Sequence, residues 1–499
     1  MKKGILLKDA TIINEGNIFE SSVLIVGDRI EEVGDKSIGY KGIGDKGIEN
    51  KGIGYRGIGY RGIGYRGNEE IGGFKDLKIT IIDCKGKFLI PGIIDDQVHF
   101  REPGLTHKGD IYTESKAAVA GGITSYMEMP NTNPQTTTIE ELNKKFLLAS
   151  EKSLANYSFY LGATNDNIDE LLKVDNDKVC GIKVFMGSST GNMLVDNEDS
   201  LNNIFSKCKS LIAVHCEDES IIQKNIADFK KQFGDNIPIR KHLEIRSREA
   251  CFKSSAFAVS LAKKYNTRLH ILHLSTEDEI SLLTQTYEPE AHVTQSNYEP
   301  EARVTIKRIT SEVCVHHLWF NDSDYEKYGN KIKWNPAIKK ESDRKALLNA
   351  LKNNLIDVVA TDHAPHTIEE KQNSYLKAPS GGPLVQHSLN VMLELYKKGE
   401  ISLEQIVEKM CHNPARIFDV KNRGFIRKGY FADLVLVDMN KSYTVNKDNI
   451  LYKCKWSPFE GNTFNSVVTH TFVNGKLVFE NGKIDESVRG VALEFERRS

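Results

Sequence analysis

The stretch Pro91-Gly-Ile-Ile-Asp-Asp-Gln-Val-His-Phe-Arg-Glu-Pro-Gly104 decides the fold of this chain. It begins as an apolar, β-branched run and ends in a charged turn, which is typical of a buried strand that carries side chains to an opening. His99 and Arg101 are two residues apart, so on an extended strand they share a face with Gln97. A histidine beside a fixed cation suits a site that activates water near an anionic substrate. An isolated histidine would be better explained as a core residue, so the interpretation depends on residues further along the chain.

Length and composition narrow the class of protein. The 499 residues can bury a large core, and they favour one large domain plus a smaller one. A formal net charge of −1 provides no basic field for nucleic acid or an anionic membrane. No apolar run approaches the roughly twenty residues of a membrane span, and no signal-peptide core follows Met1. Eight scattered cysteines without a C-x-x-C pair favour free thiols in a reducing cytoplasm.

β-rich sequence lies on both sides of a central region. The first β-rich part contains a five-residue repeat over residues 38–67, which is too short and too rich in glycine to bury a core face. We interpret this repeat as a surface insertion. The strands before and after the central region are predicted to form one small composite β-sandwich. The predicted division is 1–88 for its N-terminal part, 89–426 for the central domain and 427–499 for its C-terminal part.

In the central region, strands alternate with helical segments. Eight such strands in one domain predict an α/β fold of the (β/α)8 TIM-barrel type, whose chemistry lies at the C-terminal ends of the strands. A doubly wound open sheet is the alternative, but no Gly-rich phosphate loop follows the first strand. A Pro- and Glu-rich near-repeat at 286–305 predicts a surface loop. The predicted strands are Gly92–Phe100, Ile123–Met129, Tyr157–Leu161, Val179–Met186, Leu211–His215, Arg268–Leu274, Ile309–Trp319 and Asp357–Thr361.

Polar side chains lie at the ends of four of these strands: Lys183, His215, His273 and Asp362. Neutral imidazoles and carboxylates in such places bind zinc. A structural role is a fair interpretation of any one of them, but the set together favours a metal site. Lys183 is the exception, because burying an ammonium group is costly. Carbamylation by CO₂ would convert it into an anionic ligand able to bridge two metals, and a salt bridge to an acid is the alternative.

These residues resemble the amidohydrolase superfamily, and within it the class I dihydroorotases. The resemblance rests on His99-Phe-Arg-Glu-Pro-Gly104, Met129-Pro-Asn-Thr-Asn-Pro134 and Thr361-Asp-His-Ala-Pro-His366. It implies a zinc-dependent cyclic amide hydrolase with one or two zinc ions. The implied reaction is the reversible cyclisation of N-carbamoyl-L-aspartate to dihydroorotate plus water, in de novo pyrimidine biosynthesis. A cytoplasmic homo-oligomer is also implied, with aspartate transcarbamoylase as a candidate partner.

The resemblance implies a role for each matching residue. His99 and Asp362 would bind the first metal, and Asp362 would also be the catalytic proton shuttle. Lys183, as a carbamate, would bridge the two metals. His215 and His273 would bind the second metal. The positions implied to hold the substrate are Arg101, Asn131 and His366 for its carboxylate and Asn335 for its ring.

Arg101 separates this resemblance from hydantoinase- and allantoinase-like sequences, which keep the histidines and the lysine but lack this arginine. Their substrates carry no ring carboxylate, whereas a guanidinium matches a carboxylate with a two-pronged contact. Two departures stand beside the resemblance. The family's first strand normally carries His-x-His, but Gln97 occupies the first position, and a carboxamide oxygen is a weaker zinc ligand than imidazole. The loop at 380–387 also differs, so no substrate contact is carried over to it.

Two other functions stay open from the sequence. An inactive, dihydroorotase-like structural partner of another pyrimidine enzyme is favoured by Gln97. A hydantoinase- or allantoinase-like cyclic amidase would share the metal ligands but not the need for Arg101.

Overall fold

The structure is a computed structural model, and it describes residues 2–34, 77–187, 193–284 and 307–497. The two repeats predicted at 38–67 and 286–305 lie outside the described residues. Within the described parts, no helix is both long and apolar enough to cross a membrane.

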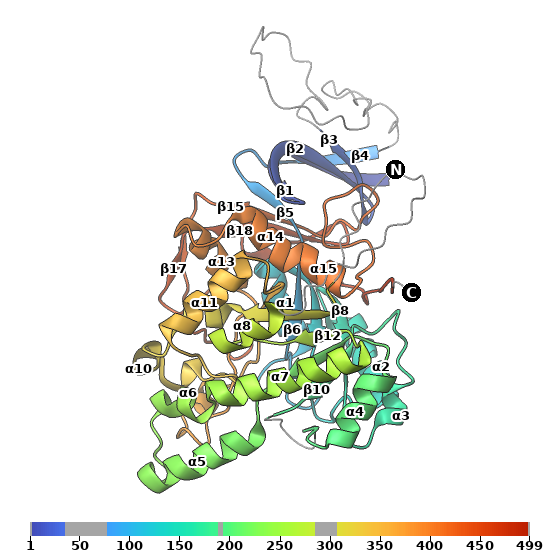
Figure 1. The fold of residues 1–499 in the computed structure, drawn as a ribbon. Coiled ribbons are helices and arrows are strands. Elements are labelled where there is room, and N and C mark those ends of the chain that lie inside the picture. The colour runs from blue at the N-terminus through green and yellow to red at the C-terminus, as the bar shows by residue number, and fades with distance from the viewer. Residues whose placement is uncertain (1, 35–76, 188–192, 285–306, 498–499) are drawn as a thin grey trace.

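Strands from both ends of the chain form one sheet, at the top of Figure 1. Its order is β20-β19-β18-β15-β5-β1-β2-β3, with β4 beside β1. β5 and β15 pair antiparallel, with Leu434 opposite Pro91 and Val437 opposite Phe88. This pairing confirms the composite β-structure, because it joins the N-terminal and C-terminal strands directly. The boundaries at 88 and 426 stay predictions. The strands are β1 (Lys2–Asn14), β2 (Asn17–Val26), β3 (Arg29–Gly34), β4 (Leu77–Asp83), β5 (Phe88–Pro91), β15 (Leu434–Asp438), β18 (Val467–Val473), β19 (Lys476–Glu480) and β20 (Lys483–Ile484), and a separate pair is β16 (Tyr443–Thr444) with β17 (Thr463–Phe464).

The central strands close into the predicted barrel. β6, β7 and β8 pair in parallel, and so do β9 to β14 in chain order. A parallel bridge between Val98, at the end of β6, and His363, beyond β14, joins the first strand to the last. The barrel strands are β6 (Ile93–Val98), β7 (Ile123–Glu128), β8 (Asn156–Phe159), β9 (Leu161–Gly162), β10 (Ile182–Phe185), β11 (Ile212–His215), β12 (Leu269–Ile271), β13 (Ile309–Cys314) and β14 (Val358–Ala360).

Several predicted barrel strands are shorter at their ends in the structure, and two differ from the prediction in a further way. The third is interrupted at Tyr160, whose hydroxyl donates to Asp96 O in the barrel interior at 3.0 Å, so that β8 pairs with β7 and β9 with β10. The strand predicted at Ile309–Trp319 was wrong in its second half, because β13 ends at Cys314 and a helix follows. Its ladder partner β14 ends at Ala360, opposite Cys314, so no strand pairing continues beyond that point and α9 (Val315–Trp319) follows.

Helices surround the barrel (Figure 1). One end of the barrel is closed by η3 and α15, where Lys409 Nζ donates to Ile356 O and Asn413 Nδ2 donates to Asp357 O, each at 2.8 Å. Because these carbonyls precede β14, the closed end is the N-terminal end of the strands. The helices are α1 (Ile111–Ala120), α2 (Ile139–Lys152), α3 (Ile168–Leu171), α4 (Glu198–Lys207), α5 (Glu219–Phe233), η1 (Ile239–Lys241), α6 (His242–Ile245), α7 (Arg248–Tyr265), α8 (Glu277–Thr284), α9 (Val315–Trp319), α10 (Asp324–Tyr328), η2 (Gly329–Ile332), α11 (Glu341–Lys352), α12 (Ile368–Lys371), α13 (Ser388–Lys397), α14 (Leu403–Val407), η3 (Glu408–His412) and α15 (Asn413–Ile417).

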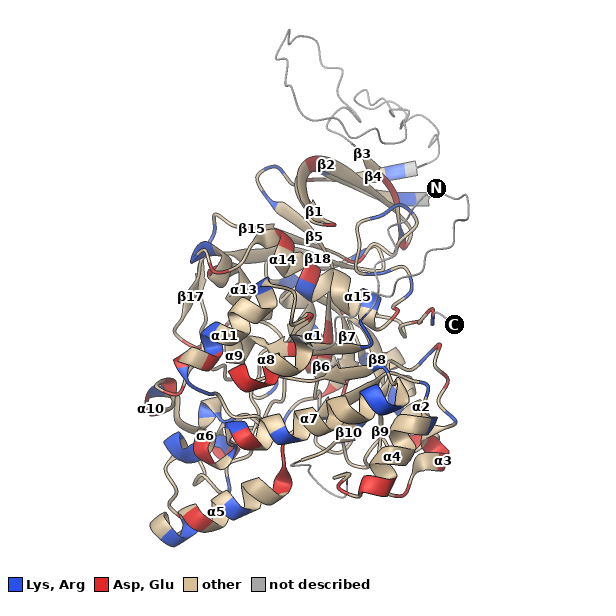
Figure 2. Cartoon of the chain, in the orientation of Figure 1, with Lys and Arg blue, Asp and Glu red and all other residues tan. Residues whose placement is uncertain are grey.

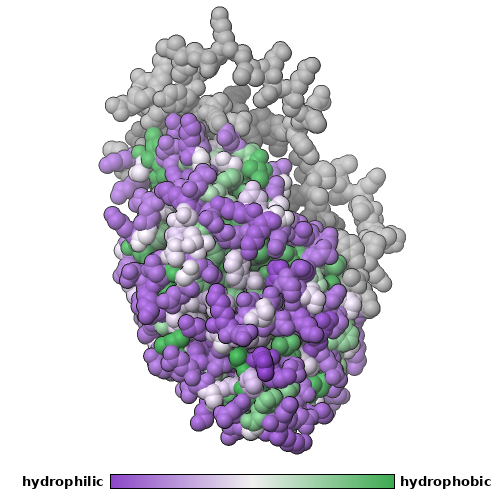
Figure 3. Space-filling view, turned by 90° about the vertical axis from the view of Figure 1, so that its left-hand side faces the viewer, coloured by the Kyte–Doolittle hydropathy of each residue, from purple (hydrophilic) through white to green (hydrophobic). Residues whose placement is uncertain are grey.

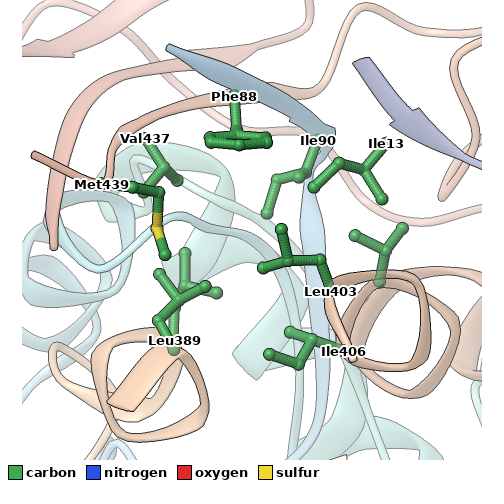
Figure 4. Close-up of a pocket in the computed structure, with 10 residues that line it drawn as sticks. Ile13, Phe88, Ile90, Leu389, Leu403, Ile406, Val437 and Met439 are labelled. Atoms are coloured by element: carbon green, nitrogen blue, oxygen red, sulfur yellow. The ribbon is translucent and has the colours of Figure 1, made fainter. Parts of the chain in front are cut away.

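An apolar cavity lies at the seam between the composite sheet and the barrel. In Figure 4, Phe88 and Ile90 of β5 face Leu389 of α13 and Ile406 of α14. All the side chains that line it are apolar. Because such a cavity offers no hydrogen bond to a ligand or to water, it is a gap in the packing rather than a site of chemistry.

Charges of both signs are interspersed over the molecule (Figure 2), in keeping with the small net charge of the chain. On the face shown in Figure 3, hydrophilic residues predominate and apolar residues form small patches. Small scattered apolar patches are normal on a protein surface. Neither view therefore points to a binding face. The site residues predicted from the sequence lie instead toward the open end of the barrel.

Candidate active site

The turn that follows β6 is locked to a second turn at 130–134. Gly104 has a φ of +83°, and a Cβ at this position would lie 1.9 Å from Asn133 O. Asn133 N donates to Pro103 O at 3.1 Å. Only glycine allows so close an approach of two backbones in this conformation. The packing explains why two sequence motifs separated along the chain act as one structural unit beside His99.

His99, Gln97 and Asp362 meet at this turn. Asp362 Oδ1 lies 3.1 Å from His99 Nε2 and accepts a hydrogen bond from Gln97 Nε2 at 3.2 Å. Gln97 and His99 therefore do share a face, as predicted. The prediction that Arg101 continues the same extended strand was wrong, because β6 ends at Val98 and Arg101 has a φ of +72°. Asn131 Oδ1 lies 2.6 Å from His99 Nδ1, so the ring donates there and leaves Nε2 as the nitrogen that faces Asp362. Burial lowers the pKa of His99, which favours a neutral ring.

His215, at the end of β11, faces His273, which lies just beyond the neighbouring strand β12. His215 Nδ1 lies 3.0 Å from His273 Nε2, and burial lowers the pKa of both rings. Two neutral imidazole nitrogens this close suit a shared ion, because His N–Zn bonds are about 2.0–2.1 Å long. Lys183 is 1% exposed, and no described residue forms a hydrogen bond with its Nζ. Burial lowers the pKa of Lys183 to about 7.

A carboxylate orients His215 from behind. His215 Nε2 lies 3.0 Å from Glu217 Oε2, and Glu217 also pairs with Arg246. Burial alone would raise the pKa of Glu217, but the Arg246 charge and the His215 hydrogen bond lower it to about 2. The ionised carboxylate accepts a hydrogen bond from Nε2–H of His215. The other ring nitrogen, Nδ1, is then unprotonated, and its lone pair faces His273.

We therefore expect Glu217→Gln to weaken metal binding by about 10–100-fold, because a carboxylate behind a histidine ligand raises its basicity and fixes its tautomer. Competition with a chromogenic chelator would measure this affinity. Glu244→Gln, which alters an exposed carboxylate on α6, is the control. Unchanged affinity in Glu217→Gln would show that the carboxylate only neutralises Arg246.

Arg101 and His366 form a third group. Arg101 Nε donates to Pro365 O at 3.0 Å, and Nη2 lies 3.0 Å from His366 Nε2. No described residue accepts a hydrogen bond from Arg101 Nη1. Lys108 Nζ lies 3.1 Å from His366 Nδ1 and 3.0 Å from Glu370. Burial lowers the pKa of Arg101 to about 10, so its guanidinium is charged at neutral pH.

Asn335 lies in the loop between η2 and α11. Its Oδ1 is buried and accepts no hydrogen bond from a described residue. The loop is tied to the segment at 379–382 through Lys371, whose Nζ donates to Lys333 O, Pro379 O and Gly381 O at 2.7–3.2 Å. Ser380 O in turn lies 3.0 Å from His366 Nε2. The 380–387 segment, to which the resemblance assigned no contact, thus supports the His366 ring.

Backbone strain is concentrated among these residues. Arg101, His273 and Asp362 have φ values of +72°, +40° and +47°. The left-handed region costs about 1–2 kcal/mol for residues other than glycine. Strained backbone of this kind gathers at functional sites, where the surrounding structure holds it.

The predicted site residues thus fall into neighbouring groups at the ends of different barrel strands. The Asp362 charge acts on both Lys183 and Arg101, so the three groups share one electrostatic environment. Sequence reasoning missed Glu217 and Lys108. Glu217 could have been found, because it lies two residues after His215 on an extended segment. Lys108 carried no comparable signal, since its contact with His366 spans distant parts of the chain.

The comparison with protein families decides where this barrel belongs. A family model described as "Amidohydrolase family" matches residues 88–478. The chain belongs to the amidohydrolase family. The match contains every barrel strand and all the residues of the candidate site.

Several relatives of this amidohydrolase are close enough to compare over most of their length. A dihydroorotase of Methanosphaera stadtmanae is 31% identical over 430 residues, covering 83% of this chain and 93% of the relative. A dihydroorotase of Pyrococcus abyssi is 32% identical over 422 residues, covering 84% and 90%. Among solved structures, an L-hydantoinase from Arthrobacter aurescens has a TM-score of 0.81 and 26% identity, with 97% of each chain covered. The structural likeness confirms the barrel with its terminal β-sheet.

Proposed function

We propose that this amidohydrolase is a dihydroorotase, which interconverts N-carbamoyl-L-aspartate and dihydroorotate plus water. The observation that carries the proposal is Arg101, a buried guanidinium two residues from His99 with Nη1 left without a described acceptor. A buried, charged fork suits the ring carboxylate of dihydroorotate. Full-length relatives named dihydroorotase support the same assignment. The proposal places the reaction in de novo pyrimidine biosynthesis.

The donor set fits zinc. His215 and His273 bring two neutral nitrogens together, and the orphaned Lys183 amine beside them would become an anionic ligand on carbamylation by CO₂. We assign these three to the second ion, with Lys183 as the bridge to the first. His99 and Asp362 would hold that first ion, because their facing atoms lie 3.1 Å apart. Bound zinc would lower the pKa of a water molecule and polarise the carbonyl of the ring amide.

Asp362 is the group that we assign to proton transfer. Its Oδ1 already contacts Gln97 and His99, while Oδ2 accepts no hydrogen bond from a described residue. Oδ2 is therefore available to take a proton from the attacking water and return it to the ring nitrogen as the amide opens. The contacts of Oδ1 with Gln97 and His99 hold the carboxylate in this place.

The substrate would be held by Arg101, His366 and Asn131 at its carboxylate and by Asn335 at its ring. Arg101 offers Nη1, and His366 is fixed in position by contacts to both of its nitrogens. Asn131 uses Oδ1 on His99, so its amide nitrogen is the part that we assign to the substrate. The buried, unpartnered Oδ1 of Asn335 suits an N–H donor of the ring.

Gln97 bears on the metal count. Its Nε2 donates to Asp362 while its Oε1 lies 3.8 Å from Cys314 Sγ, so the amide is a hydrogen-bond donor toward the carboxylate. This arrangement supports weaker binding of the ion at His99 and Asp362. We expect the wild-type active site to hold closer to one zinc than two, and Gln97→His to raise the occupancy at His99 and Asp362. Metal analysis of both proteins after identical dialysis measures this, and an equal zinc count in the two proteins would contradict it.

Two other functions are tested by the same purified protein. A hydantoinase-like amidase, favoured by the structural likeness to an L-hydantoinase, would hydrolyse dihydrouracil or hydantoin in preference to dihydroorotate. An inactive partner of another pyrimidine enzyme, favoured by Gln97, would bind metal and yet turn over none of these compounds. A cytoplasmic location, a homo-oligomer and an association with aspartate transcarbamoylase stay predictions.

A further inference from the structure

Three buried side chains gather in the barrel interior apart from the residues assigned above. Asp96 of β6, His270 of β12 and Glu312 of β13 each bring one ligand atom within 4.8 Å of the others. All three residues are 0% exposed. Asp96 reaches the interior because the pairing of β6 with β7 shifts register between Asp95 and Val98.

This group, which we call the interior cluster, lies between the barrel floor and the candidate active site. On the floor side, Tyr160 donates to Asp96 O, and the Phe418 ring meets His270 edge-on with centroids 5.4 Å apart. On the active-site side, Glu312 Oε1 accepts a hydrogen bond from His273 N at 2.9 Å. The cluster is therefore enclosed by protein and linked to one candidate ligand through its backbone.

Three of the four carboxylate oxygens in the interior cluster lack a hydrogen-bond donor within the described parts of the chain. Neither side-chain oxygen of Asp96, nor Glu312 Oε2, accepts a hydrogen bond from any described residue. What faces them is His270 Nε2, which lies 3.1 Å from Asp96 Oδ2 and 3.6 Å from Glu312 Oε2. Buried carboxylates without donors are costly, and proteins offset that cost by pairing the charge or binding a cation.

The histidine of the interior cluster is oriented as a ligand would be. His270 Nδ1 lies 2.8 Å from Thr310 Oγ1, which fixes the ring so that Nε2 faces both carboxylates. Metal-binding histidines almost always have their second nitrogen held by a neighbour in this way. One imidazole nitrogen with two carboxylates is a ligand set found for zinc, manganese and ferrous iron.

We propose that Asp96, His270 and Glu312 form a separate divalent-cation site in the barrel interior. A cation there would neutralise the two carboxylates and fix Glu312, which in turn holds the backbone amide of His273. The proposal does not depend on which cyclic amide the enzyme uses. The competing occupant is a proton shared among the three groups.

The test counts metal ions rather than activity. After equilibration with zinc and dialysis, Asp96→Asn is expected to hold one ion per chain fewer than the wild type, because metal binding needs the ionised carboxylate. The double variant His215→Ala/His273→Ala, which removes two ligands of the candidate active site, is expected to keep the interior ion. Adding Asp96→Asn to that double variant should remove it.

Asp95→Asn is the matched control. Asp95 is an equally buried carboxylate on the same strand, but it accepts hydrogen bonds from Thr361 and Gln97 N instead of joining the cluster. Its variant should keep the wild-type ion count. Equal counts in wild type and Asp96→Asn would overturn the proposal. If Asp96→Asn fails to fold, anomalous diffraction from zinc-loaded wild-type crystals decides, since no peak among the three residues overturns the site. A wild-type protein that turns over dihydroorotate but holds no ion among these three residues would overturn the interior site and leave the proposed function standing.

Discussion

Lys183→Ala is expected to lose the active-site metal and catalytic activity together. The Lys183 side chain lies in the barrel interior with its Nζ 4.6 Å from the centre of the Phe185 ring, and no described residue accepts a hydrogen bond from it. Burial lowers the pKa of Lys183 to about 7, although the charges of Glu312 and Asp362 raise it. About half of the amine is therefore neutral at pH 7. Only the neutral amine can attack CO₂, which forms the carbamate and releases one proton.

The expected loss of metal affinity is large because alanine has no amine that could become a bridging carbamate. Contacts behind a ligand alone alter metal affinity by about 10–100-fold, so removal of a bridging ligand should exceed that range. Short carboxylic acids such as acetate or propionate, at high concentration, should restore part of both metal content and turnover by filling the space of the carbamate. Metal analysis and assay of the same sample measure the two together.

Lys178→Ala is the control for this experiment, because it removes an exposed lysine that precedes the same barrel strand. It should behave as wild type with and without added acid. A fully metallated and active Lys183→Ala protein would show that another residue bridges the ions. Loss of activity with full metal content would assign Lys183 to charge balance instead, with Glu312 as its partner.

Much of the barrel could be predicted, because its strands are short apolar runs separated by amphipathic segments. The ends of those runs also bring the predicted polar groups to one end of the barrel, since parallel strands deliver their C-terminal residues there. His99 and Gln97 both contact Asp362, as their spacing of two residues requires. The helix that begins at Val315 was missed because its apolar residues continue the composition of β13, and only the end of the ladder with β14 stops the strand.

Other features depend on distant parts of the chain and so left no local signal. Asp96 should point away from the face of Gln97 by strand alternation, and only the register shift in β6 turns it toward His270. The left-handed φ of His273 is imposed by its surroundings, because no glycine or asparagine marks the position. From the sequence, Lys371 would be expected at an exposed helix end. In the structure its ammonium group is buried and donates to three carbonyls.

Arg101→Met is expected to lower kcat/KM for dihydroorotate by about 30–1000-fold. The loss of a charge-assisted contact to a buried carboxylate costs about 2–4 kcal/mol, and each 1.36 kcal/mol is a factor of ten. Methionine keeps much of the apolar stem, so the packing around Pro365 should persist. Metal content should hardly change, since Arg101 contacts His366 and Pro365 O.

A substrate without the ring carboxylate distinguishes loss of the carboxylate contact from a general loss of structure in Arg101→Met. Dihydrouracil presents the same ring amide without the ring carboxylate, so Arg101→Met should leave its slow turnover nearly unchanged. Arg101→Lys retains the charge but not the two-pronged geometry, and it should fall between wild type and methionine. Equal losses of kcat/KM on both substrates would mean that Arg101 positions His366 and its neighbours instead of binding the substrate carboxylate. Near-normal turnover of dihydroorotate by Arg101→Met would remove the main support for a dihydroorotase. If the wild-type protein preferred dihydrouracil, the assignment would move to a hydantoinase-like amidase. In that case the Arg101 guanidinium would not bind a substrate carboxylate and could not favour dihydroorotate over dihydrouracil.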